Sequence, residues 1–216
     1  MKAAVLGTGM VGVTIGSKLL DLGHSVKMGS RTADNEKGKA FAQKSPNANS
    51  GTFAEAAAFG EIIFNCTSGM ASLNALNLAG AVNLKGKIIV DLSNPLDFTN
   101  GMPPTLSVVN TSSLGEEIQK AFPDSKVVKT LNTINCILMV NPGMVNGGDH
   151  HIFMSGNDAG AKGEVKEILK SFGWNETHIL DLGDITSARG TEMYMLLWLR
   201  LYGAKGTGAF NLKIVS

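Results

Sequence analysis

The segment that most constrains the fold is the stretch AAVLGTGMVG near the start of the chain. Its apolar run, Ala3–Leu6, stops at Gly7, which is typical of a strand buried on both faces of a parallel sheet. Apolar residues then recur at helical spacing over residues 11–22. A buried strand, a glycine-rich turn and an amphipathic helix in direct succession predict the first half of a βαβ unit.

The same alternation of apolar runs and helical segments continues along the chain. Further strands are expected at Ser25–Met28, Glu61–Asn65, Lys87–Leu92, Val127–Leu131, His151–Met154, His178–Leu182 and Phe210–Val215. Helices are expected at residues 34–44, 161–172 and 187–202. Alternating strands and helices with right-handed crossovers give a sheet covered on both faces. The sequence therefore predicts an α/β fold, with a doubly wound, mostly parallel sheet of the Rossmann type and a small C-terminal helix-plus-strand segment.

This pattern divides the chain into two expected parts. Residues 1–183 form an extended dinucleotide-binding domain, and residues 184–216 form a C-terminal helix and strand. The long helix of the second part has apolar residues on nearly every side over Met193–Leu201, with Trp198 among them. Such a helix is either a contact between two copies of the chain or the wall of a substrate pocket, and we expect a homodimer contact.

Composition and charge favour a soluble enzyme. The 216 residues are 44% apolar, and the formal net charge is +1, with no basic arm or acidic tail. We therefore expect no nucleic-acid partner and no membrane partner. The sequence shows no secretory signal and no apolar stretch near the roughly 20 residues of a membrane helix, so a cytoplasmic location is expected. Cys66 and Cys136 lie far apart and form no CxxC pair, which predicts neither a disulfide nor a metal site.

The glycine-rich turn is a candidate pyrophosphate site. Its GxGxxG pattern allows a tight turn at Gly7, close approach of a ligand at Gly9, and close packing of the helix at Gly12. The N–H groups at the start of the helix then face the anion. The binding residues predicted here are Gly7, Thr8, Gly9, Met10 and Val11. The alternative is an unremarkable strand-to-helix turn whose glycines are incidental.

The end of the second strand indicates which dinucleotide binds. NAD-specific folds usually place a carboxylate there, to bond the ribose 2′-hydroxyl. This chain has Ser30, Arg31 and Thr32 instead. A guanidinium and two hydroxyls suit a 2′-phosphate, which a carboxylate would repel. We therefore predict NADP(H); the alternative is an NAD-specific protein in which Arg31 is solvated. Lys37 is a further cation whose role stays open.

Several motifs together resemble the F420-dependent NADP oxidoreductases. They are AVLGTGMVG, LGHSVKMGSR, LNTI, LDLGDITSARGTEMYMLLWLRLYG and FNLKIV, which span nearly the whole chain. The sequence also resembles the NADP-binding domain of the STEAP metalloreductases. The family resemblance implies a Rossmann domain, a homodimer, and hydride transfer between NADP(H) and a deazaflavin.

The resemblance also implies site residues beyond the first two strands. Cys66, Thr67 and Ser68 match a loop that borders the ribose. Ser93 and Asn94 match a loop near the nicotinamide, and Thr133 with Ile134 matches the loop that faces its ring. Two stretches depart from archaeal members: Asn132–Asn135 replaces His-Thr-Ile-Pro, and Ser68-Gly69 replaces Pro-Trp. These loops shape the deazaflavin pocket in the family, so the departures leave the second substrate open, with F420 and a flavin as the candidates.

Hydride transfer between two rings needs no side-chain nucleophile, because the cofactors carry the chemistry. We therefore expect no catalytic side chain and no metal ligand. The adjacent pair His150-His151 could suggest a metal, but neighbouring strand residues point to opposite faces, so a structural role is favoured. Two other functions stay open: a non-catalytic NADP(H)-binding sensor or electron-relay subunit, and an imine reductase of the pyrroline-carboxylate reductase type.

Overall fold

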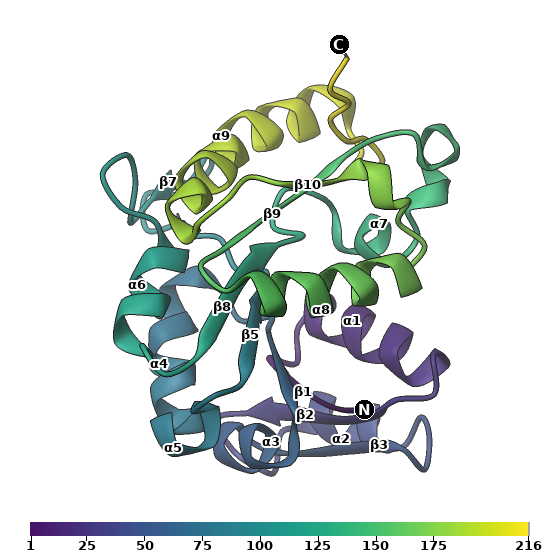
Figure 1. The fold of residues 1–216 in the computed structure, drawn as a ribbon, viewed down its shortest axis with the longest axis vertical. Helices are drawn as coiled ribbons and strands as arrows, with labels where there is room; N and C mark the ends of the chain where they lie inside the picture. The colour runs from purple at the N-terminus through teal and green to yellow at the C-terminus, as the bar shows by residue number, and fades with distance from the viewer. Residues whose placement is uncertain (216) are drawn as a thin grey trace.

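An eight-stranded sheet with helices on both faces forms the centre of the computed structural model, which describes residues 1–215 (Figure 1). Its strands are β1 (Lys2–Leu6), β2 (Ser25–Ser30), β3 (Ala48–Thr52), β4 (Ile62–Asn65), β5 (Ile88–Asp91), β8 (Lys126–Thr130), β9 (Ile152–Gly156) and β10 (Ile179–Asp181). Their order across the sheet is β10-β9-β8-β5-β4-β1-β2-β3. All neighbours are parallel except β8 and β9. This confirms the predicted α/β fold with a mostly parallel sheet.

The helices divide between the two faces of the sheet. They are α1 (Met10–Asp21), α2 (Glu36–Ala42), α3 (Phe53–Phe59), α4 (Gly69–Ala79), α5 (Ala81–Leu84), α6 (Leu114–Ala121), α7 (Cys136–Val140), α8 (Ala159–Ser171) and α9 (Ala188–Lys205). Short 3-10 helices lie at Pro142–Met144, Asn146–Gly148, Glu176–His178 and Ile185–Ser187. Buried side chains of α1, α2, α7 and α8 share one apolar cluster, and those of α3 to α6 share another with the first residue of α9.

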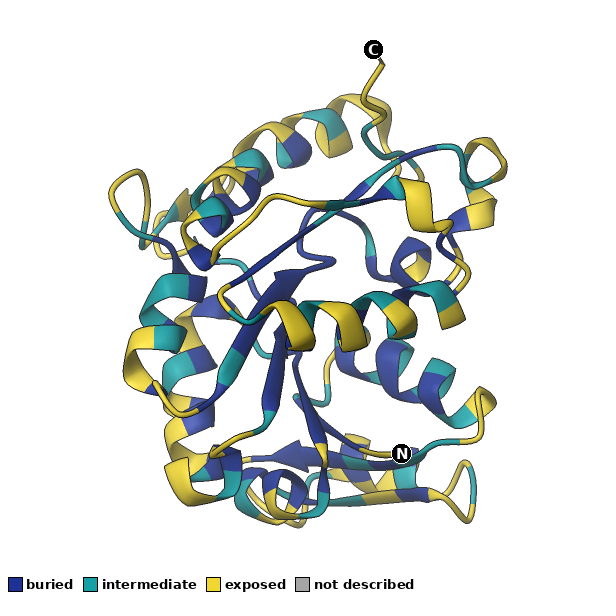
Figure 2. Cartoon of the chain, viewed as in Figure 1, coloured by how far each residue is buried: buried dark blue, intermediate teal, exposed yellow. Residues whose placement is uncertain are grey.

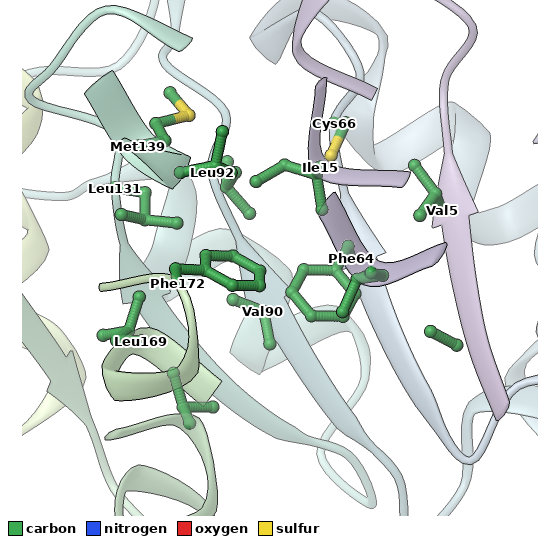
Figure 3. Close-up of a cluster of buried hydrophobic side chains, with 14 of the residues drawn as sticks. Val5, Ile15, Phe64, Cys66, Val90, Leu92, Leu131, Met139, Leu169 and Phe172 are labelled. Carbon is green, nitrogen blue, oxygen red and sulfur yellow. The ribbon is translucent and has the colours of Figure 1, made fainter. Parts of the chain in front are cut away.

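The side chains along each strand alternate between the two clusters, because successive side chains of a strand point to opposite faces of the sheet. In β1, Ala3 and Val5 face the first cluster while Ala4 and Leu6 face the second. Figure 3 shows part of the first cluster, where Phe64 and Phe172 lie close to Val90. Burial on both faces explains the unbroken apolar runs of the sequence and the dark blue colour of the central strands in Figure 2.

Several elements were not predicted from the sequence, among them the edge strand β3 and the helices α3 to α7. The edge strand β3 has the sequence ANSGT and carries no apolar run. The helix after it, α3, begins with a capping box. Thr52 accepts a hydrogen bond from the backbone N–H of Glu55, whose carboxylate accepts one from the backbone N–H of Thr52. A helix of only seven residues shows too little periodicity to be recognised.

The predicted strand at Phe210–Val215 is wrong. The segment has no regular structure, although it runs beside His151, whose backbone N–H donates to the carbonyl of Leu212. The next contact is made by a side chain, because the backbone N–H of Ile214 donates to Nδ1 of His151. Asn211 likewise donates to Nδ1 of His150. These side-chain bonds replace the ladder that a strand needs.

Between β5 and α6 the chain forms a two-stranded hairpin, β6 (Leu96–Asp97) with β7 (Thr105–Leu106).

The long helix α9 matches the helix predicted at 187–202. No helix among the described residues combines the length and apolar character needed to cross a lipid bilayer.

Candidate functional site

Five parallel strands, β1, β2, β4, β5 and β8, end at the same edge of the sheet, which gathers the loops that follow them. The chain reverses its direction of winding between β1 and β4, since β2 and β3 lie on one side and β5 and β8 on the other. Ligands of open α/β sheets bind at such a switch point. Backbone hydrogen bonds hold the loops in place there. The N–H of Gly7 donates to the carbonyl of Gly29, and the N–H of Cys66 donates to the carbonyl of Leu6.

The glycine-rich turn leaves the first turn of α1 open. Gly9 is its N-cap, no side chain caps the helix, and no acidic residue lies in the first turn. A Cβ at Gly12 would overlap the carbonyl oxygen of Gly7. The start of α1 therefore packs against the end of β1 more closely than any residue with a side chain would permit. A Cβ at Gly9 would meet nothing within 4 Å. Open space in front of uncapped N–H groups fits a bound pyrophosphate.

A hollow of about 370 Å³ lies on one side of this turn; we call it the smaller hollow. It is lined by Gly7, Thr8, Ser30, Arg31, Thr32, Asn35 and Phe53. Arg31 is exposed and forms no ion pair with any residue from 1 to 215. The hydroxyl of Ser30 donates to the carbonyl of Thr32, which shapes the loop and leaves the oxygen of Ser30 free to accept. The smaller hollow thus presents a free guanidinium beside the glycine-rich turn, as a 2′-phosphate requires.

A second hollow, of about 600 Å³, lies on the other side and is called the larger hollow. It is lined by Val11, Thr67, Ser68, Gly69, Met70, Leu92, Ser93, Asn94, Leu96, Asp97, Phe98 and Thr99. Thr8 lines the smaller hollow and Val11 the larger one, so a single turn of chain separates the two. A dinucleotide whose pyrophosphate lay on this turn would reach one hollow with each half.

Buried hydrogen bonds fix the loops around the larger hollow. Asn65 donates to Oδ1 of Asp91 (2.8 Å) and accepts from the hydroxyl of Thr67 (2.7 Å). Asn94 donates to the carbonyl of Asn132 (2.7 Å), and the side chain of Asn132 donates back to Oδ1 of Asn94 (3.0 Å). The loops after β4, β5 and β8 are therefore tied to one another.

Beneath these loops lies a cluster of three buried charges, Asp91, Lys129 and Glu192. The ammonium of Lys129 lies 2.8 Å from Asp91 Oδ2 and 2.8 Å from Glu192 Oε1. Burial disfavours the charged ammonium, but attraction and hydrogen bonds from both carboxylates outweigh it, so the pKa of Lys129 lies above its usual value. Sequence patterns did not reveal this charge cluster, because its members come from β5, β8 and α9.

Four predicted site residues line neither hollow. Gly9 and Met10 lie between the hollows on the turn itself, with the side chain of Met10 exposed. Cys66 is buried, and burial followed by the nearby charge of Asp91 raises the pKa of its thiol, so it stays protonated. Thr133 is buried, and its hydroxyl has no hydrogen-bond partner among residues 1–215.

The remaining predicted residues line the hollows. Gly7, Thr8, Ser30, Arg31 and Thr32 surround the smaller hollow; Val11, Thr67, Ser68, Ser93 and Asn94 surround the larger one. Sequence reasoning missed Asn35 and Phe53 in the smaller hollow. The signal for Asn35 is its N-cap position on α2, where it accepts from the N–H of Gly38 (3.0 Å). Lys37 is exposed on α2 and does not line the hollow.

Comparison with known proteins decides the family. Residues 2–95 match the family described as NADP oxidoreductase, coenzyme F420-dependent. A crystal structure of a putative F420-dependent NADP reductase from Arthrobacter sp. FB24 is 53% identical, covers 100% of both chains and superposes with a TM-score of 0.94. The chain belongs to the F420-dependent NADP oxidoreductase family. It is an NADP-dependent oxidoreductase.

More distant similarities agree with the fold. Metalloreductase STEAP3 of Rattus norvegicus is 30% identical over 193 residues, which are 88% of this chain but 36% of that protein. The chain thus spans about a third of the length of this curated relative. An imine reductase from Bacillus cereus is 16% identical, with a TM-score of 0.65 over 95% of this chain and 62% of its own. At that identity the likeness concerns the fold alone.

Proposed function

We propose that this protein transfers hydride between NADP(H) and a flavin-like or deazaflavin ring. The observation that carries the proposal is the pair of hollows on the two sides of the glycine-rich turn. The smaller hollow, with its free guanidinium, takes the adenosine 2′-phosphate half of the cofactor. The larger hollow takes the nicotinamide half and the ring with which it reacts.

The proposed contacts follow from the glycine-rich turn at the start of α1 and from the lining of the smaller hollow. Thr8, Gly9, Met10 and Val11 hold the pyrophosphate at the start of α1, and Arg31 pairs with the 2′-phosphate. Bound NADPH supplies two electrons and one proton as hydride, and a second proton from water completes the reduced ring. The protein's own contribution is to bind both rings, orient them and exclude water.

The lining of the larger hollow suits a planar, weakly charged ring. Met70 and Phe98 expose most of their side chains there and offer apolar surface for stacking. Asp97 is its one charged lining residue among those that the structure describes. The names of relatives agree in part: the Arthrobacter protein is called a putative F420-dependent NADP reductase, and STEAP3 a metalloreductase.

Stopped-flow oxidation of NADPH by a panel of acceptors tests this proposal. The panel contains deazaflavin F420, free flavins, quinones, a ferric chelate and a cyclic imine, and NADPH absorbance is followed with each. We expect the deazaflavin or a flavin to oxidise NADPH fastest, because their rings can stack in the larger hollow. Fastest oxidation by the imine would favour an imine reductase. Oxidation by none would favour the sensor or electron-relay role and overturn the proposal.

We propose further that the protein is a homodimer joined through α9. Met193, Leu196 and Leu197 are exposed on this helix. Beside them lies an apolar groove of about 420 Å³, lined by Pro103, Pro104, Thr105, Leu106, Val109, Leu196, Leu199 and Arg200. A second copy that covered this surface would remove it from water.

Replacement of Leu197 by glutamate should dissociate such a dimer. Leu197 is 54% exposed, and a charge at the centre of an apolar interface should weaken association at least ~30-fold. Trp198 is unsuitable for the test, because it is only 8% exposed and its replacement would disturb the subunit itself. Sedimentation velocity measures the result. Leu78→Glu, at a leucine 50% exposed on α4, is the matched control. A sedimentation coefficient unchanged in Leu197→Glu would contradict the interface.

A further inference from the structure

The charge cluster of Asp91, Lys129 and Glu192 holds one wall of the larger hollow. Lys129 donates to the carbonyl oxygen of Ser93 as well as to the two carboxylates. Asp91 accepts from the backbone N–H of Ser93 (3.2 Å) and from its hydroxyl (2.6 Å). Both polar ends of the Ser93 backbone and its side chain are thus bonded to members of the charge cluster.

Asn94, the next residue, connects the loop after β5 to the loop after β8. Asn94 exchanges two hydrogen bonds with Asn132, in the loop after β8. Ser93 and Asn94 both line the larger hollow, whereas Lys129 and Asp91 lie behind them. The charge cluster therefore acts on the hollow through the Ser93–Asn94 segment and not by direct contact.

Glu192 completes the charge cluster from α9. Its carboxylate accepts from the N–H groups of Leu114 (2.8 Å) and Gly115 (3.0 Å) at the start of α6, and from Lys129. The positive end of α6 and the ammonium together compensate its buried charge. Without this carboxylate, Lys129 would have Asp91 as its sole charged partner among the described residues, and its hold on Ser93 would loosen.

We propose that Lys129, held between Asp91 and Glu192, is a positioning residue that fixes the Ser93–Asn94 segment so that the nicotinamide half of NADP(H) meets a preorganised wall. This inference rests on the proposed function, which places the nicotinamide half in the larger hollow. It also gives a role to the C-terminal sequence motif that contains Glu192. Through Lys129, this motif supports the wall of the larger hollow without lining it.

The replacement Glu192→Gln tests the inference. The replacement keeps the shape of the side chain but turns one acceptor oxygen into an NH2 donor. That NH2 group must face either the N–H of Leu114 or the donors of Lys129 and Gly115, so hydrogen bonds are lost in both orientations. We expect the Kd of NADPH to rise about ten-fold, as the loss of a charge-assisted hydrogen bond does when its effect reaches the ligand. The probe for the other half is adenosine 2′,5′-bisphosphate, whose Kd should stay within about two-fold, because no lining residue of the smaller hollow touches the charge cluster.

Glu116→Gln is the matched control. Glu116 also joins α6 to α9, through two hydrogen bonds from Arg189, but neither residue contacts Ser93 or Lys129. Both dissociation constants should be unchanged in this variant. A ten-fold loss of NADPH binding in Glu116→Gln would mean that docking of α9, and not the charge cluster, shapes the site, and would overturn the inference.

The outcomes separate the inference from the function on which it rests. Equal losses of both ligands in Glu192→Gln would show a general structural role, and no loss of either would show that the charge cluster positions nothing. If Glu192→Gln does not fold, Asp91→Asn decides, since it loosens Ser93 from the other side and should give the same split between the two ligands. If the parent protein binds neither ligand, the proposed function fails instead.

Discussion

Replacement of Lys129 by methionine should lower the free energy of unfolding by about 3–5 kcal/mol. The change removes the one ammonium between two buried carboxylates and leaves both Asp91 and Glu192 without their charged partner. An uncompensated buried charge costs far more than an intact buried pair contributes. Equilibrium urea denaturation followed by circular dichroism measures the difference.

Two further variants show whether charge is the cause. Lys85→Met breaks an exposed ion pair with Asp124 and should cost at most about 1 kcal/mol. Adding Asp91→Asn and Glu192→Gln to Lys129→Met removes the charges left behind and should restore part of the stability. A loss in Lys129→Met as small as that in Lys85→Met would contradict the role of the charge cluster.

The pH dependence of this loss follows from the direction of the pKa shift. Because the pKa of Lys129 in the folded protein lies above its unfolded value of 10.5, its stabilising contribution is fully present below that value. It is lost only as the pH rises through the folded pKa. The contribution of Lys129 to the stability of the parent protein should therefore be constant between about pH 6 and about pH 9, so a change in the difference from Lys129→Met over this range comes from the two unpaired carboxylates of the variant.

Replacement of Arg31 by aspartate should weaken NADPH binding about 100-fold, because it exchanges charge-assisted hydrogen bonds to the 2′-phosphate for repulsion. NADH lacks this phosphate, so its affinity should be kept or improved, since a carboxylate at this strand end can bond the ribose 2′-hydroxyl. Fluorescence titration with NADPH and NADH at one fixed salt concentration measures both affinities.

Lys37→Asp is the control for Arg31→Asp. It makes the same change in charge on α2, outside the lining of the smaller hollow, and should alter the affinity for NADPH only a few-fold. An equal loss in both variants would mean that the general field of the surface, and not Arg31 itself, attracts the phosphate. Unchanged NADPH binding in Arg31→Asp would refute the assignment of the smaller hollow.

The parts of the fold that the sequence predicted are those in which local pattern and burial agree. Strands such as β1 and β4 are buried on both faces, so each is an uninterrupted apolar run. The polar edge strand β3 has no such pattern. The final segment, 210–215, has the apolar composition of a strand but is held by the side chains of His150 and His151, which no local pattern could indicate.

The candidate site follows the same division. Arg31 and the glycine-rich turn directly follow strands, so their place at the edge of the sheet could be read from the order of elements. The charge cluster could not, because Asp91 and Lys129 are 38 residues apart and Glu192 lies on a helix assigned to a different part of the chain. Only the fold shows that the largely apolar helix α9 places a carboxylate beneath the loops of the larger hollow.

The contact between Glu192 and the start of α6 also bears on how the chain matures during synthesis. Glu192 accepts from residues 77 and 78 positions earlier, so the start of α6 has no acceptor until the first turns of α9 have been translated. Until then Lys129 has Asp91 as its one carboxylate partner among the described residues. Such long-range closure makes folding slow and late. A nascent chain released before Glu192 should therefore be a substrate for chaperones or proteases, although it already contains every residue that lines the two hollows.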